Sequence, residues 1–129
     1  MLTTAPIQVM IVDNHLIVRE SLKLFLSTFA DLEVVAEASN SEEALKVGAP
    51  LQPDVVLLDL LMPDINGPTT TRSLREVCPS AKVLILTNFS EEPMLQETLQ
   101  AGASGYLYKD SHPEELVTLI RAVHTNGST

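Results

Sequence analysis

Three short apolar runs constrain the fold of this chain more than any other feature of its sequence. They are rich in leucine and β-branched residues and cover Ile7–Val12, Val55–Leu58 and Val83–Leu86. Apolar runs of this length are typical of strands that helices cover on both faces, as in a parallel sheet. Two weaker runs, Glu33–Ala38 and Gly105–Tyr108, complete five predicted strands.

Signals for helices lie between these runs. One apolar stripe predicts a helix after His15, and its members are Val18, Leu22, Phe25 and Phe29. Asn40 and Glu43 have the spacing of a capping box, and we expect Gly48 to end the short helix that they open. Pro68 stands where the first turn of a third helix tolerates proline.

The last two helices have start and stop signals of their own. Ser90 is predicted to cap the fourth helix and Gly102 to close it. Ser111 and Glu114 form a second capping box, before an apolar stripe made of Leu116, Leu119, Ile120 and Val123. Strand and helix thus alternate along the whole chain, which predicts an α/β fold with an open parallel sheet and helices on both faces.

Composition limits the class of protein. A chain of 129 residues that is 45% hydrophobic can bury one core, so we expect one domain. The single cysteine, Cys78, excludes an internal disulfide and fits a reducing, cytoplasmic compartment. No run is long enough for a membrane span, and the first residues lack the features of a signal peptide. A formal charge of −9 with scattered Lys and Arg makes this chain a poor binder of nucleic acid.

Chemically useful side chains follow the apolar runs directly. They are Asp13 and Asn14 after the first strand, Asp59 after the third, Thr87 after the fourth and Lys109 after the fifth. Because ligands bind at the carboxyl ends of the strands in open α/β sheets, we expect these side chains to converge at one edge. Carboxylates that approach each other repel, and Mg²⁺, which prefers oxygen ligands, would relieve that repulsion.

A hydroxyl and an ammonium beside two carboxylates suit phosphoryl transfer. Positive charge and hydrogen-bond donors stabilise the oxygens of a transferring phosphoryl group, and Asp59 is the best nucleophile because it ends the central strand. Taken singly, a strand-end Asp is more often a helix cap or turn former, and a lone Lys is usually solvated. The occurrence of such residues after four of the five predicted strands favours a shared site. We expect His15, which opens the first helix, at the surface or as a cap.

Four sequence blocks resemble the receiver domain of two-component response regulators. In chain order they are Ile-Val-Asp13-Asn14-His15, Val-Val-Leu-Leu-Asp59-Leu-Leu-Met62-Pro63 with Asn66-Gly67, Leu-Ile-Leu-Thr87, and Gly102-Ala-Ser-Gly105-Tyr106-Leu-Tyr-Lys109-Asp110. In residues and spacing they are most similar to the NarL/FixJ-like subfamily, whose receiver domain precedes a LuxR-type helix-turn-helix domain.

The resemblance covers nearly the whole chain and implies its architecture. Residues 1–129 would form a single receiver domain with a core over residues 7–123, and residues 124–129 would be a frayed tail or the start of a linker. The implied fold is a flavodoxin-like (βα)5 three-layer sandwich, with a five-stranded parallel sheet in the order 2-1-3-4-5.

The resemblance also implies a role for each site residue. Asp59 would be the phosphoacceptor, and it would hold Mg²⁺ together with Asp13, Asn14 and the backbone carbonyl of Leu61. Thr87 would bond a phosphoryl oxygen.

Two further residues would support the chemistry and the switch. Lys109 would pair with the acceptor or its phosphate, and Tyr106 would swing inward when Thr87 moves. The chain would not be an enzyme toward other molecules, because it would catalyse phosphoryl transfer only to and from its own Asp59.

The implied partners are a sensor histidine kinase and DNA, the latter only through a C-terminal domain that this chain lacks. No membrane contact is expected. A homodimer would form through the fourth helix face or through the last helix, where Val117 adds to the apolar stripe.

Two residues depart from the family pattern. Asn14 stands where the family usually has Asp, and Asp110 follows Lys109 where many receivers have proline. The first departure leaves an alternative open, a phosphorylation-independent interaction module with a weakened metal site. A flavodoxin-like ligand carrier is a more distant alternative.

Overall fold

Strand and helix alternate along the chain, as the sequence predicts. The computed structural model describes residues 5–60 and 66–126. The strands are β1 (Ile7–Val12), β2 (Leu32–Ala38), β3 (Val55–Asp59), β4 (Lys82–Thr87) and β5 (Gly105–Tyr108). The helices are α1 (Leu16–Ser27), α2 (Ser41–Leu51), α3 (Gly67–Val77), α4 (Glu92–Gln100) and α5 (Pro113–Asn126). All strand pairs are parallel, in the order β2-β1-β3-β4-β5.

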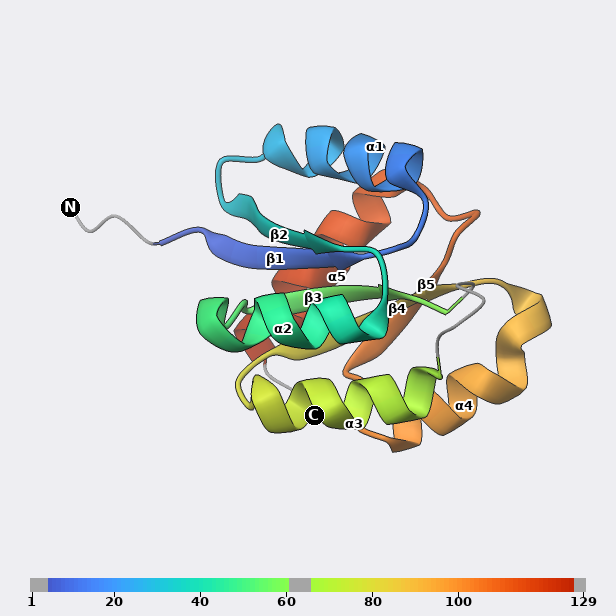
Figure 1. Ribbon diagram of the computed structural model, residues 1–129. Coiled ribbons are helices and arrows are strands. Elements are labelled where there is room, and N and C mark those ends of the chain that lie inside the picture. Colours follow the sequence, from blue (N-terminus) through green and yellow to red (C-terminus); the bar gives the residue numbers. More distant parts are fainter. Residues whose placement is uncertain (1–4, 61–65, 127–129) are drawn as a thin grey trace.

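The sheet separates two apolar cores. Because successive side chains of a strand point to opposite faces, Val9 and Ile11 of β1 belong to one core while Met10 and Val12 belong to the other. Helices α1 and α5 close the first core, and α2, α3 and α4 close the second (Figure 1). Every residue of the central strand β3 is buried. These observations confirm the three-layer, flavodoxin-like architecture.

The strand bounds differ from the predicted ones by a residue at a few ends. β1 and β5 match the prediction, and β2 begins one residue earlier. β3 and β4 are longer at their carboxyl ends, so Asp59 and Thr87 are the last residues of their strands rather than the first residues of the loops. No helix among the described residues is long and apolar enough to cross a membrane.

Helix α2 opens as predicted but ends later. The side-chain oxygen of Asn40 accepts a hydrogen bond from the backbone N–H of Glu43 at 2.8 Å. The prediction that Gly48 ends this helix is wrong, because the helix continues to Leu51. Gly48 packs against Cys78 instead, since a Cβ at this position would lie 3.3 Å from the cysteine sulfur. Its missing side chain serves packing between α2 and the end of α3.

Ser90 and Ser111 do not occupy the N-cap positions predicted for them. Ser90 belongs to a short 3-10 turn before α4, and both its backbone N–H and its hydroxyl donate to the side-chain oxygen of Asn88. Helix α5 begins at Pro113, two residues after Ser111, so Ser111 does not cap it. Proline begins a helix readily because its fixed φ suits the first turn, where its missing N–H has no helical partner anyway. Gly102 follows α4 with a φ of +119°, as expected of a residue that closes a helix.

The buried faces of α1 and α5 differ from the predicted stripes. In α1 the fully buried residue is Leu26, whereas Val18 is 37% exposed and Phe29 lies beyond the end of the helix. In α5 the side chain of Val117 is buried together with Leu116. Val117 therefore adds to the buried face and not to a surface for a homodimer, because α5 turns a wider face toward the sheet than one stripe requires.

An exposed ion pair ties α5 to the turn before β2. The guanidinium of Arg121 donates from Nε and Nη2 to the two carboxylate oxygens of Asp31, at 2.8 and 2.9 Å. These hydrogen bonds hold the pKa of Asp31 below its usual value. The same guanidinium lies 5.4 Å from the ring centroid of Phe29. Because the pair is exposed and screened by solvent, we expect it to contribute little to stability.

Gly67 provides a test of the packing between α3 and α4. A Cβ at this position would lie 2.5 Å from Thr98 Oγ1 and 2.6 Å from Leu60 Cδ2, and both neighbours are buried. Helix propensity alone favours Gly67→Ala, but the overpacking is expected to lower the free energy of unfolding by about 1–3 kcal/mol. Chemical denaturation measures this change. Thr69→Ala on the exposed side of α3 is the control, and equal stability of Gly67→Ala and the parent would contradict the packing.

Candidate functional site

The register of the sheet brings two carboxylates together. β1 pairs with β3 so that Val12 lies opposite Leu58. The next residues of the two chain segments, Asp13 and Asp59, therefore stand side by side at the carboxyl edge. Asp13 is 1% exposed and Asp59 is fully buried. This is the convergence that the sequence predicts for the first and third strands.

The neighbouring strands add a hydroxyl and an ammonium at the same edge. Thr87 ends β4, is fully buried, and accepts a hydrogen bond at its carbonyl oxygen from the backbone N–H of Lys109 at 2.8 Å. Lys109 Nζ lies 2.9 Å from Asp59 Oδ1, and the lysine side chain is 30% exposed. Four predicted site residues thus meet at one edge of the sheet.

Asp13 has hydrogen-bonding capacity left at the centre of the site. Its Oδ1 accepts a hydrogen bond from the backbone N–H of His15 at 2.8 Å. Its Oδ2 is buried and has no hydrogen-bond partner within the described part of the chain. A buried carboxylate oxygen without a partner is costly, so a ligand that supplies positive charge there is favoured.

A group of three side chains at this edge has the composition of a cation site. One oxygen each of Asp13 and Asp59 and one ring nitrogen of His15 all lie within 4.8 Å of one another. Two carboxylates brought this close fit a divalent cation, because its charge offsets their repulsion.

His15 is the member of this group that sequence reasoning assigned elsewhere. It occupies the N-cap position of α1 and its side chain is 58% exposed, so the predicted surface position is confirmed. Its ring nevertheless reaches the carboxylate of Asp13. The position of His15 two residues after a strand-end Asp is the signal that points to this contact.

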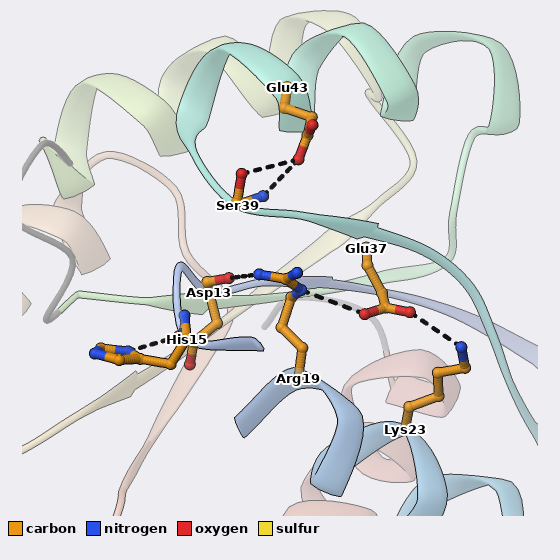
Figure 2. Close-up of polar contacts among 7 residues, drawn as sticks. All are labelled: Asp13, His15, Arg19, Lys23, Glu37, Ser39 and Glu43. Atoms are coloured by element: carbon orange, nitrogen blue, oxygen red, sulfur yellow. Dashed lines mark hydrogen bonds and ion pairs between the residues drawn. The ribbon is translucent and has the colours of Figure 1, made fainter. Parts of the chain in front are cut away.

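A charged network of Arg19, Glu37 and Lys23 holds the loop that carries Asp13. Figure 2 shows Arg19 between the two segments, donating from Nη1 to the carbonyl oxygen of Asp13 at 2.7 Å and from Nε to Glu37 at 3.3 Å. Lys23 donates to the other oxygen of Glu37 at 3.2 Å. Burial alone would raise the pKa of Glu37, but the hydrogen bonds and charges of Lys23 and Arg19 outweigh it and lower the pKa. The network therefore joins β2, α1 and the site loop.

A second polar contact shown in Figure 2 orders the turn after β2. Glu43 accepts hydrogen bonds at Oε1 from the backbone N–H and the hydroxyl of Ser39, at 2.6 and 3.2 Å. This carboxylate thereby reinforces the start of α2 at the same edge of the sheet.

The remaining predicted site residues are less closely engaged. Asn14 is exposed, and Leu61, whose backbone carbonyl is a predicted metal ligand, lies outside the described residues. Tyr106 is 43% exposed, and its ring contacts that of Tyr108 edge to face at a centroid distance of 5.5 Å. Thr87 Oγ1 donates a long hydrogen bond of 3.4 Å to the carbonyl oxygen of Asn88.

Tyr108 is a further residue at this edge that no sequence pattern points to. Its hydroxyl donates to Glu92 Oε2 at 2.7 Å, which joins the end of β5 to the first turn of α4. The hydrogen bond to the carboxylate holds the proton on the phenol and raises the pKa of Tyr108 to about 12. Tyr106 packs on a ring that is itself tethered to α4.

Comparison with known proteins identifies the family to which this site belongs. The model of the response regulator receiver domain matches residues 9–121. The chain belongs to the response regulator receiver domain family. It is thus a receiver domain of the two-component type, and the ligand-carrier alternative has no support.

Named relatives agree with this assignment. The transcriptional regulatory protein LnrK of Bacillus subtilis (strain 168) is 40% identical over 121 residues, which are 94% of this chain and 55% of that protein. The response regulator UvrY of Escherichia coli (strain K12) is 39% identical and is matched over 92% of this chain and 55% of its own length. The chain spans about half the length of the curated relatives that it matches.

A solved structure of the same class has the same fold. The LuxR-family two-component response regulator from Aurantimonas sp. SI85-9A1 is 35% identical to this receiver and superposes with a TM-score of 0.86. The match covers 95% of this chain and 87% of the other chain.

The pKa of Tyr108 can be measured in isolation. Tyr106→Phe leaves Tyr108 as the only tyrosine, and the chain has no Trp to obscure its ultraviolet absorbance. We expect phenolate formation at a pH of about 12 in this variant. A further Glu92→Gln change should move the midpoint toward about 10, because the carboxylate that holds the proton is gone. Circular dichroism checks that both variants remain folded, and coincident titration curves would refute the tether.

Proposed function

We propose that this receiver accepts a phosphoryl group on Asp59 from a phosphohistidine of a sensor histidine kinase. In the transfer, a carboxylate oxygen of Asp59 forms a bond to phosphorus as the phosphorus–nitrogen bond of the phosphohistidine breaks. The imidazole of the kinase takes the bonding electron pair as the leaving group. The single observation that carries the proposal is the buried Asp59 carboxylate held 2.9 Å from Lys109 and beside Asp13.

A divalent cation, Mg²⁺ in this proposal, completes the site. Asp13, Asp59, the Asn14 side chain and the Leu61 carbonyl are its proposed ligands. The partnerless oxygen of Asp13 and the close approach of the carboxylates fit such an ion. When bound, the cation would supply positive charge to the oxygens of the phosphoryl group.

Two other side chains would act directly on the phosphoryl group. Lys109 would exchange its pairing with the carboxylate for pairing with the phosphorylated side chain, and Thr87 would donate its hydroxyl to a phosphoryl oxygen. The same residues would support hydrolysis of the phosphorylated Asp59. The chain would therefore catalyse a reaction of its own side chain and would not turn over another substrate.

Phosphorylation would be read out through Tyr106 and the surface around it. Movement of Thr87 toward the phosphoryl group would open space for the Tyr106 ring, which is 43% exposed and leaves its contact with Tyr108 when it turns inward. An open hollow between β5 and α5, lined by Tyr106 and Leu119 among others, borders this ring. We propose this face, or that of α4, as the surface of a homodimer.

The output would be control of transcription in the cytoplasm. We propose that residues 1–129 form the receiver domain of a longer regulator whose C-terminal domain binds DNA. The transcriptional regulators among the relatives, which are about twice the length of this chain, support this view. The alternative of a phosphorylation-independent module is not favoured, because Asp13, Asp59 and Lys109 are still brought together.

The phosphoacceptor is tested by intact-mass spectrometry after treatment with acetyl phosphate and Mg²⁺. The parent should gain one phosphoryl group, and Asp59→Asn should gain none, because an amide is not a nucleophile for phosphorus. Asp110→Asn makes the same chemical change at an exposed carboxylate next to Lys109 and should be labelled like the parent. Full labelling of Asp59→Asn would move the acceptor to another residue.

The role of Asn14 is tested by restoring the acid with Asn14→Asp. Calorimetry should record severalfold tighter Mg²⁺ binding, because affinity rises with ligand charge. In chelator the added charge repels its neighbours by about 1 kcal/mol, which should lower the melting temperature by about 2–6 °C. Asn40→Asp at the cap of α2 adds the same charge elsewhere and should leave Mg²⁺ affinity unchanged. Unchanged affinity in Asn14→Asp would remove residue 14 from the metal site.

A further inference from the structure

His15 lies closer to the carboxylates than a surface residue needs to. Its Nδ1 is 3.1 Å from Asp13 Oδ1, and Figure 2 shows the ring extending beside the Asp13 side chain from the start of α1. We propose that His15 is a ligand of the cation site, and that its imidazole makes the site favour a transition ion such as Zn²⁺ or Ni²⁺. This inference rests on the proposed cation site and adds one ligand to it.

The spacing of the two donors suits adjacent positions on one ion. Bonds of about 2.1 Å that meet at a right angle hold neighbouring ligand atoms about 3.0 Å apart. His15 Nδ1 and Asp13 Oδ1, which are in hydrogen-bond contact at 3.1 Å in this structure, have this spacing. One carboxylate oxygen of Asp59 lies within 4.8 Å of an oxygen of Asp13 and of a ring nitrogen of His15.

A second observation points to an ion at the same place. Asp13 is 1% exposed, and its Oδ2 has no hydrogen-bond partner among residues 5–60 and 66–126. Buried carboxylate oxygens are normally hydrogen-bonded or bound to a metal. The carboxylate that His15 contacts therefore has an unused ligand atom of its own.

The imidazole of His15 contacts the Asp13 carboxylate and is not used to cap the helix. His15 occupies the N-cap position of α1, yet its side chain makes no capping hydrogen bond. Because the side chain is 58% exposed, water can accept a hydrogen bond from Nε2–H, and this tautomer leaves the lone pair of Nδ1 for a cation. Substitution of this residue consequently removes a donor without removing a helix cap.

The ligand atoms of the site predict for which ions the binding affinity depends on His15. Mg²⁺ takes oxygen ligands almost exclusively, whereas Zn²⁺ and Ni²⁺ bind imidazole well. Asn14 provides a neutral oxygen where the family usually has a carboxylate, so the site lacks part of the negative charge that favours Mg²⁺. Loss of the His15 ring should thus weaken the binding of Ni²⁺ and Zn²⁺ and leave that of Mg²⁺ nearly unchanged.

Calorimetry with NiCl₂ and MgCl₂ tests this on the purified chain. His15→Ala should weaken Ni²⁺ binding by at least about tenfold, the scale of loss typical for groups that support a metal site. Mg²⁺ affinity should change by less than about twofold, because imidazole contributes little to it. His124→Ala removes an exposed imidazole near the end of α5 and should change neither affinity. Equal Ni²⁺ affinity in His15→Ala and the parent, or an equal loss in His124→Ala, would overturn the proposal.

Nuclear magnetic resonance of the unmodified chain gives a second readout that needs no variant. On titration with ZnCl₂, the imidazole ¹⁵N signals of His15 should shift first among the three histidines. A Zn²⁺ response confined to the other two would also overturn the proposal. If acetyl phosphate with Mg²⁺ fails to label Asp59 while Zn²⁺ shifts His15, the proposed function fails and the ligand assignment stands. If Asp59 is labelled and His15 does not respond to Zn²⁺, the ligand assignment fails and the proposed function stands.

Discussion

Mutual repulsion between Asp13 and Asp59 is the constraint around which this edge of the sheet is organised. Two unit charges about 4 Å apart repel by about 4 kcal/mol under the screening typical of protein surfaces, a large share of the stability of a small domain. The parallel register places these two residues side by side, because Val12 and Leu58 are paired just before them. Lys109 offsets part of this repulsion from β5, and Arg19 holds the Asp13 loop from α1. The close approach of the two carboxylates is therefore costly unless positive charge faces them.

The sequence was sufficient to predict the sheet and the centre of the site. Ile7–Val12 and Val55–Leu58 are almost entirely apolar, which is typical of strands covered on both sides. A polar residue directly after such a strand must lie at its carboxyl edge, however the helices pack. Asp13 and Asp59 were predicted for this reason, and their closeness is confirmed by the structure. The assignment of Asn14 and Leu61 to the metal site stays a prediction.

Features that depend on contacts between distant segments could not be read from local patterns. Glycine is common just after the end of a helix, so Gly48 is predicted to end α2. The close approach of Cys78, at the end of α3, instead requires a small residue inside α2. Val117 lies outside the predicted apolar stripe of α5 but is buried. The width of the buried face of α5 depends on how the helix lies on the sheet, which the sequence pattern does not specify. The hydrogen bond between Tyr108 and Glu92 joins two elements whose distance apart no periodicity specifies.

Because Cys78 is buried, its reactivity toward thiol reagents reports local unfolding of the core around it. The thiol is fully buried at the end of α3, and burial raises its pKa, so the reactive thiolate is scarce in the folded chain. Because the sequence holds no second cysteine, any thiol-specific alkylating reagent that modifies the protein reports exposure of this one position. The alkylation rate then measures how often the core between α2 and α3 opens, with or without a cation at the opposite end of the central strand.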